Sequence, residues 1–252
     1  MIRKGSPSLP INNCIIGFDA EWTKNYKIKN GNVPFCFSAV SIKRSNLTIT
    51  NLRSGKISFE YVQFYCEDRN EIKELISNAN SFFSAIINSL DYSLVSGHQL
   101  SSDFSVFLNI ANALGSNNAK NIAKIVSLWR DRKNNRTIFD TRYDIDKPFL
   151  GKSRRLVDMC TDFNLDVQQP ELANKSMTKL QNQYYDTKEA IIRERLSVMN
   201  LRHSFSAVVL TLLNEQLTDT PIAEKINLNK TLNNMLHSDF KWINTPEFKS
   251  LV

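Results

Sequence analysis

Two acidic residues lie inside an apolar run near the start of the chain, and no other run constrains the fold as strongly. The segment CIIGFDAEW (14–22) alternates, so that one side carries Cys14, Ile16, Phe18, Ala20 and Trp22, whereas the other carries Ile15, Gly17, Asp19 and Glu21. This alternation predicts a strand. Ionised carboxylates are rarely buried without a positive partner, so the strand either exposes Asp19 and Glu21 to water or uses them to hold a cation.

The pattern that follows changes from strands to helices. We predict three further strands, at 34–42, 46–52 and 57–65. They are followed by a helix at 69–90, a strand at 92–97, a helix through SSDFSVFLNIANAL that opens near Asp103, and a strand at 136–141. The first strands suit an antiparallel meander, and the later alternation suits βαβ crossovers. Together they predict an α/β fold with a mixed sheet and helices on its faces.

The last third of the sequence has a helical pattern. It comprises RRLVDMCTDFNL, a long run from Ser176 to Leu217, and an amphipathic piece from Pro221 to about His237. No Pro/Gly-rich linker or repeat divides the chain. We therefore expect one domain over residues 1–252, with a core at about 12–215 and a C-terminal helical extension at 216–252.

Composition adds limits on the partners and the compartment. At 252 residues and 42% hydrophobic content the chain can bury one large core, and its net charge of +7 favours a polyanionic partner. The four cysteines are far apart and form no CxxC pair, which indicates reduced, buried thiols. The N-terminus has no apolar signal-peptide region, and no uninterrupted apolar stretch has the length of a membrane span. We therefore expect a cytoplasmic protein with no membrane contact.

The paired acidic residues have a specific chemical use. On a strand, Asp19 and Glu21 project from one face with Cβ atoms about 6–7 Å apart, which suits them to hold hard cations. Mg²⁺ and Mn²⁺ prefer such oxygen ligands, and two ions about 4 Å apart can clamp a phosphodiester. The alternative for this DxE pattern is an edge strand with a solvated face.

A further carboxylate lies beside a turn. The segment VSGHQLSSDFSVFL (95–108) runs from a strand through a glycine and a polar turn into the helix that opens near Asp103. One interpretation is that Ser101, Ser102 or Asp103 caps this helix. The other is that Asp103 joins the two strand carboxylates.

FDAEW and GHQLSSDF at this spacing resemble the first two motifs of the DEDD-type 3′-5′ exonucleases of the His subclass. The resemblance covers roughly residues 12–165 and implies a ribonuclease-H-like mixed sheet. It also implies that Asp19, Glu21 and Asp103 are catalytic and hold Mg²⁺ or Mn²⁺ in a two-metal site. A strand ending in Asp-Thr, here Asp140 and Thr141, and a following short helix agree with the family order.

The third motif matches only in part. The family has a histidine followed five residues later by an aspartate, and NLRHSFSAVVLTLL (200–213) supplies His203 but has Val208 at the second position. The resemblance makes His203 the general base, which a neutral imidazole suits. Without the fourth carboxylate, three outcomes are open. One ion is bound weakly, or Glu194 supplies a carboxylate or Asn200 a neutral oxygen in its place, or the activity is lost. Alternatively, His203 is a hydrogen-bonded histidine on a buried helix. His98, in the glycine turn, is expected to make a structural hydrogen bond.

Basic and aromatic residues near these motifs predict the substrate contacts. Lys and Arg cluster at 130–136, 151–155 and 193–203, where they can track a phosphate backbone. The nucleic-acid-binding residues that we predict are Trp22, Phe104, Arg154, Arg155 and Arg202. The two aromatic residues are placed to stack on terminal bases, although either also suits a core position.

The sequence thus predicts a metal-dependent hydrolase that removes nucleotides from 3′ ends of DNA or RNA, with a single-stranded end as the preferred substrate. The main alternative is a nucleic-acid-binding module that keeps the exonuclease fold without turnover. A third possibility is a protein-contact role for the helical C-terminal third. The sequence leaves the oligomeric state open.

Overall fold

The centre of the fold is a mixed sheet of six strands in the order β1-β4-β3-β2-β5-β6. The computed structural model describes residues 1–25, 27–28, 31–145, 154–216 and 224–252. The strands are β1 (Ile2–Gly5), β2 (Cys14–Thr23), β3 (Val33–Lys43), β4 (Glu60–Tyr65), β5 (Leu94–Gly97) and β6 (Ile138–Asp140). β1, β4, β3 and β2 pair antiparallel, whereas β2, β5 and β6 pair parallel. The α/β class and the mixed sheet are confirmed.

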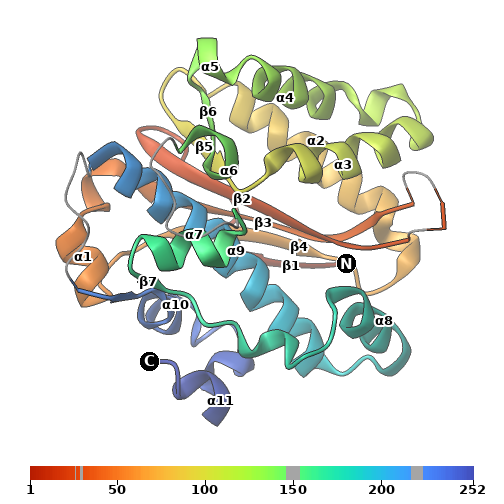
Figure 1. Ribbon diagram of the computed structural model, residues 1–252. Coiled ribbons are helices and arrows are strands. Elements are labelled where there is room, and N and C mark those ends of the chain that lie inside the picture. The colour runs from red at the N-terminus through yellow and green to blue at the C-terminus, as the bar shows by residue number, and fades with distance from the viewer. Residues whose placement is uncertain (26, 29–30, 146–153, 217–223) are drawn as a thin grey trace.

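Helices cover both faces of this sheet (Figure 1). One face carries α2 (Ile72–Ile87), α3 (Leu100–Leu114) and α4 (Lys120–Arg130), and the other is crossed by α9 (Ala190–Gln216). The alternation in β2 divides its side chains as predicted. Phe18 and its even-numbered neighbours belong to the core shared with α2 and α3, whereas Ile15 belongs to the core under α9. Asp19 and Glu21 therefore face α9.

Helix α9 is apolar around most of its circumference. It is the one helix among the described residues whose length and composition would suit a membrane span, and 94% of the relevant window is buried in the fold. Sequence analysis finds no such stretch because charged residues interrupt the run. A helix that is buried on all sides behaves as the core of a packed protein.

The remaining elements are short. They are α1 (Ile49–Ser54), α5 (Arg132–Asn135), α6 (Thr141–Asp144), α7 (Leu156–Asp162), α8 (Met177–Thr187), α10 (Leu228–Leu236) and α11 (Pro246–Lys249), with the two-residue strands β7 (Leu165–Asp166) and β8 (Ile226–Asn227) forming a separate parallel pair. Most of them pack below α9 in Figure 1, where they close its outer side. All four cysteines are free and buried, as predicted.

Three predictions of secondary structure are wrong. The predicted strand at 46–52 is helix α1, because the Thr48 side chain accepts a hydrogen bond from Asn51 N and Gly55 ends the helix at φ 66°. The polar N-terminal leader contains β1, which pairs with β4 at the edge of the sheet. The final amphipathic helix begins at Leu228, not at Pro221, and residues 221–223 lie outside the described residues.

Candidate metal centre

Strand β2 carries both acidic residues on the face that α9 covers. Its pairing with β3 shifts register between Glu21 and Trp22, so that Glu21 lies opposite Cys36 and Trp22 opposite Pro34. A bulge of this kind turns a side chain out of the regular alternation and is frequent beside functional sites. Here the extra residue is Phe35 of β3, opposite the step from Glu21 to Trp22, and β2 stays paired with β3 as far as Thr23.

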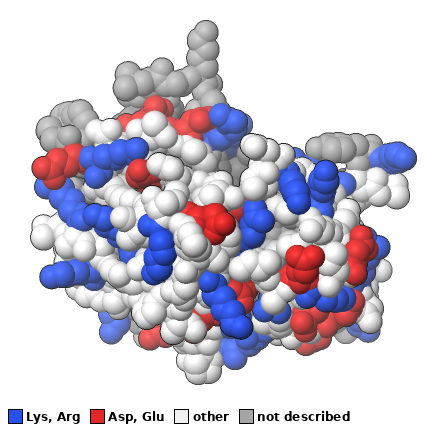
Figure 2. All heavy atoms as spheres, turned by 90° about the horizontal axis from the view of Figure 1, so that it is seen from below, with Lys and Arg blue, Asp and Glu red and all other residues white. Residues whose placement is uncertain are grey.

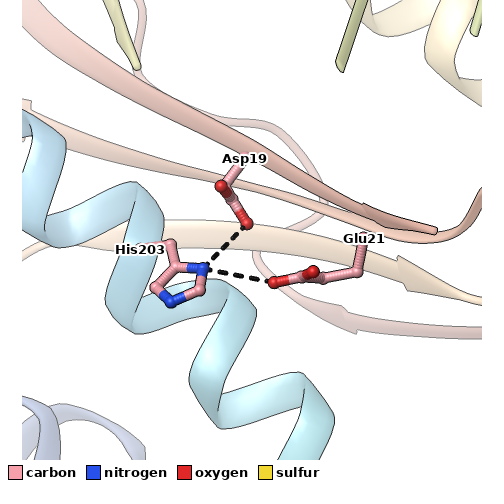
Figure 3. Close-up of side chains that lie close together, drawn as sticks. All are labelled: Asp19, Glu21 and His203. Carbon is pink, nitrogen blue, oxygen red and sulfur yellow. Dashed lines mark ion pairs between the residues drawn. The ribbon is translucent and has the colours of Figure 1, made fainter. Parts of the chain in front are cut away.

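His203 points from α9 between the two carboxylates (Figure 3). Its Nδ1 lies 3.2 Å from Glu21 Oε1 and 3.5 Å from Asp19 Oδ2. One ligand atom from each of these three residues falls within 4.8 Å of the other two, so Asp19, Glu21 and His203 together can hold a metal ion. We call these three residues the Asp-Glu-His cluster.

A side-chain amide fixes the first carboxylate. Asn200, one turn before His203, donates through Nδ2 to Asp19 Oδ2 at 2.7 Å. Its Oδ1 accepts instead from Gln63 Nε2 and Cys36 Sγ, both at 3.3 Å. Asn200 therefore presents a donor to the cluster. It orients Asp19 and does not supply the neutral oxygen that the sequence had suggested.

Asp103 reaches β2 from the first turn of α3. Its Oδ1 accepts a hydrogen bond of 3.0 Å from the backbone N of Ala20, the residue between the two strand carboxylates. The N-terminal N–H groups of α3 are satisfied by another residue, because Asp140 accepts from Gln99 N at 2.8 Å and Leu100 N at 2.9 Å. The cap of α3 has no side-chain hydrogen bond, so the capping alternative is wrong. Asp103 is bonded to the backbone between Asp19 and Glu21, but it is not one of the residues whose ligand atoms lie within 4.8 Å of one another.

The carboxylates are poorly compensated by positive charge. Burial and the charge of Asp19 raise the pKa of Glu21 to about 7, against the opposing effect of His203. Burial, together with the charges of Asp19 and Glu21, also raises the pKa of Asp103 well above its ordinary value. Burial alone would lower the pKa of His203, but the charges of Asp19 and Glu21 outweigh it and raise that pKa to about 10. These shifts follow from three carboxylates and one imidazole that are buried close together, and they favour a protonated His203 beside Asp19 and Glu21.

Sequence analysis missed the partner of the second imidazole nitrogen. Gln169 places its Nε2 2.9 Å from His203 Nε2, so both ring nitrogens have neighbours. Gln169 lies two residues before Glu171, whose carboxylate accepts two hydrogen bonds of 2.6 Å from the guanidinium of Arg202. This ion pair is completely buried and anchors the loop that carries Gln169 to α9. No local pattern in the sequence marks this loop.

The position of the family's fourth carboxylate lies in the core. Val208 is fully buried, and a Cβ added to Gly17 would lie 2.7 Å from Val208 Cγ2 and 2.1 Å from Ser204 O. The helix and β2 therefore touch through their backbones at this point. Glu194 lies nearer the N-terminus of the same unbroken helix and accepts a hydrogen bond from Trp242 N at 3.0 Å, so it does not replace the missing carboxylate.

Two of the predicted nucleic-acid contacts are wrong in this structure. Phe104 is 1% exposed and packs against Phe18 and Phe83, so it cannot stack on a base. Arg202 is completely buried in its ion pair with Glu171, so it cannot reach a phosphate. In both cases the side chain belongs to the core and not to the surface that the charge or aromatic pattern suggested.

The other predicted contacts remain accessible. Trp22 is half-buried and lines a cleft of about 580 Å³ with Lys24, Asn25, Ile28, Gly31, Asn32, Ser101, Ser102, Ser105, Val106 and Asn109. Arg154 Nη2 donates to Ile145 O at 2.8 Å, and the exposed Arg155 pairs with Asp158. The expected hydrogen bond of His98 is present, since its Nδ1 lies 2.9 Å from Thr141 Oγ1. The face seen in Figure 2 shows basic side chains dispersed among acidic and uncharged ones.

Comparison with protein-family models and with curated proteins finds no match for this chain.

Proposed function

We propose that the chain is a metal-dependent 3′-5′ exonuclease with a ribonuclease-H-like fold. The observation that carries the proposal is the convergence of Asp19, Glu21 and His203 within 4.8 Å, with Asp103 bonded to the backbone between the two strand acids. These residues come from three separate elements, β2, α3 and α9, in the order of the exonuclease motifs. The mixed sheet, a meander followed by parallel crossovers, supports the same family.

The residues present fit a divalent ion. Glu21 Oε1 is buried, and it contacts the imidazole of His203, whose Nδ1 lies 3.2 Å away and also faces Asp19. Two buried carboxylates that share one imidazole are costly unless a further cation faces them. Asp19 and Glu21 would hold the ion, and Asp103 would add a carboxylate beside them. When bound, such an ion lowers the pKa of a water molecule and stabilises the charge that develops on phosphate oxygens.

The chain's own groups would position the substrate. Trp22 and Ser102 line the cleft and are next in the chain to Glu21 and Asp103, whereas none of Asp19, Glu21, Asp103 and His203 lines it. The cleft offers one indole, the cation of Lys24 and several neutral amide and hydroxyl groups. An aromatic face and neutral hydrogen-bonding groups suit an unpaired base, because every base has a π-face and open edges. This composition favours a single-stranded 3′ end.

The direct test is digestion of 5′-labelled single-stranded DNA and RNA with Mg²⁺ or Mn²⁺. We expect stepwise shortening that requires the ion and is lost in Asp19→Asn. The matched control is Asp91→Asn, which removes the charge of an exposed aspartate in the turn before β5 and should leave digestion unchanged. Absence of ion-dependent shortening in the wild type, or shortening that survives Asp19→Asn, contradicts the proposal.

The alternative is a nucleic-acid-binding module without turnover, and one observation favours it. The imidazole of His203 lies between Asp19 and Glu21, where a protonated ring would serve as their counter-ion in place of a metal. Such a module would bind oligonucleotides in a salt-dependent way and would neither cleave them nor take up divalent ions. The digestion assay, combined with a metal titration, separates the two functions.

A further inference from the structure

We infer that His203 is a direct ligand of the divalent ion through Nδ1, and that this nitrogen ligand makes the site prefer Mn²⁺ to Mg²⁺. The inference rests on the proposed function only in taking a divalent ion to be bound at the Asp-Glu-His cluster. It changes the role of His203, which the exonuclease resemblance makes a general base. It also supplies a ligand where the family's fourth carboxylate is missing.

The spacing of the donor atoms is that of ligands on one ion. Ligand atoms about 2.1 Å from a common ion, at angles between 90° and the tetrahedral value, lie about 3.0–3.5 Å from one another. His203 Nδ1 lies 3.2 Å from Glu21 Oε1 and 3.5 Å from Asp19 Oδ2. The nitrogen is thus already at the separation from each oxygen that a single ion requires, and all three atoms lie within 4.8 Å of one another.

The other imidazole nitrogen is directed away from the cluster. His203 Nε2 contacts the side chain of Gln169 at 2.9 Å, and the Glu171–Arg202 ion pair anchors the loop that carries Gln169. A ligating histidine donates its second N–H to an acceptor, which fixes the ring orientation. In the structure the amide nitrogen of Gln169 donates to His203 Nε2, so the proton is on Nδ1. Ligation through Nδ1 therefore requires the Gln169 amide to turn, so that its Oε1 accepts from Nε2–H. A general base instead needs one ring nitrogen open to the attacking water. Neither ring nitrogen is open in this arrangement.

Nothing else on α9 can take the ligand position. Asn200 directs its amide nitrogen at Asp19, and its oxygen is bonded to Gln63 and Cys36. Val208 is packed against Gly17 in the core. Among the described residues of the helix, His203 alone brings a metal-ligating atom within 4.8 Å of a carboxylate oxygen of both Asp19 and Glu21.

A nitrogen ligand affects which ion is preferred. Mg²⁺ is bound almost exclusively by oxygen, whereas imidazole suits first-row transition ions, and Mn²⁺ accepts both kinds of ligand. Replacing the family's fourth carboxylate by an imidazole also leaves one negative charge fewer to hold the ions. The lost charge weakens both ions, whereas the nitrogen ligand weakens Mg²⁺ more than Mn²⁺.

The test is a titration of the metal-free protein with Mn²⁺, followed by the electron paramagnetic resonance signal of the free ion, and a parallel calorimetric titration with Mg²⁺. We expect tighter binding of Mn²⁺ in the wild type and a loss of about ten- to a hundredfold in His203→Ala, the scale seen when the support of a metal ligand is removed. His203→Asp should reverse the preference toward Mg²⁺. His237→Ala, which removes an exposed histidine beyond α10, is the matched control and should change nothing.

A spectroscopic measurement on the wild type guards against variants that fail to fold. Pulsed paramagnetic resonance of the bound Mn²⁺ should show coupling to a ¹⁴N nucleus, and His203→Asp should lack it. Unchanged Mn²⁺ affinity in His203→Ala, absence of nitrogen coupling in the wild type, or no Mn²⁺ binding at all overturns the inference.

The two proposals fail in different ways. Nitrogen-coupled Mn²⁺ without cleavage of any oligonucleotide would leave the ligand assignment standing and refute the exonuclease. Ion-dependent cleavage without nitrogen coupling, and with unchanged Mn²⁺ affinity in His203→Ala, would leave the exonuclease standing and refute the ligand assignment.

Discussion

Restoring the carboxylate of the exonuclease motif should destabilise this protein and not repair a site. The substitution is Val208→Asp. Val208 is fully buried on the side of α9 that meets β2 at Gly17, and the contact there is so close that a Cβ on Gly17 would overlap Val208 and Ser204. An aspartate at this position therefore finds neither water nor a cation.

The magnitude follows from two costs. Losing the burial of the valine side chain removes about 1.5–3 kcal/mol. An uncompensated buried charge costs about 3–5 kcal/mol more. The total of about 4.5–8 kcal/mol is comparable to the whole free energy of unfolding of a typical domain, about 5–15 kcal/mol. Val208→Asp should therefore be largely unfolded or close to it at pH 7.

The assay is urea denaturation followed by circular dichroism at pH 7 and pH 4.5. Val208→Ala isolates the lost packing and should cost about 2 kcal/mol. Val208→Asn adds a neutral polar group of the same size as aspartate. The pKa of the buried aspartate would be raised, so the extra cost of Val208→Asp over Val208→Asn should be large at pH 7 and should shrink as the pH falls toward the ordinary pKa of aspartate, about 4. A Val208→Asp protein as stable as Val208→Ala at pH 7, or one that binds divalent ions more tightly than the wild type, refutes this reasoning.

Three other predictions follow from the same contacts. Arg202→Met should cost about 3–5 kcal/mol because it leaves the buried Glu171 carboxylate unpaired. The double variant Arg202→Met with Glu171→Leu should recover most of that loss in thermal unfolding. Equal stability of the single and the double variant would contradict the pairing. In EDTA, the stability that His203 contributes should be complete below its ordinary pKa of 6.5 and lost as the pH rises through about 10, and the raised pKa of Glu21, about 7, acts in the same direction. The urea midpoint should therefore fall from neutral to alkaline pH, and a flat profile in the wild type would contradict the contact. Trp22→Ala should weaken binding of a single-stranded oligonucleotide by about 1–3 kcal/mol in fluorescence anisotropy, and unchanged binding would place the base elsewhere.

Period-2 and helical patterns identified the elements that carry the acidic residues. β2 was predictable because its side chains alternate between two covered faces. A shift of one residue would move Asp19 and Glu21 into the apolar core on the other face. The helix that replaces the predicted strand at 46–52 was not predictable. Its apolar residues Ile49 and Leu52 do not by themselves identify a helix, whereas Thr48 and Gly55 act as helix caps through contacts that the composition does not reveal. Local caps outweighed propensity there.

The residues around His203 were beyond sequence reasoning for a different reason. Arg202 follows Leu201 in an apolar helix, and an arginine on such a helix indicates either an exposed stripe or a buried partner. Only the fold shows that Glu171 lies against it, 31 residues away in the chain. The same long-range packing places Gln169 on His203, and no periodicity predicts a contact between a loop and a helix.

The burial of α9 links these observations into one argument about the site. A helix packed on nearly every side can keep polar residues only where they are paired, since unpaired buried polar groups cost free energy. Arg202 is paired with Glu171, and Asn200 with Asp19, Gln63 and Cys36. His203 is shared between two carboxylates, with its Nδ1 3.5 Å from Asp19 Oδ2 and 3.2 Å from Glu21 Oε1. One imidazole thus faces two buried acidic groups, and this excess of negative charge is where the fold would stabilise a bound cation.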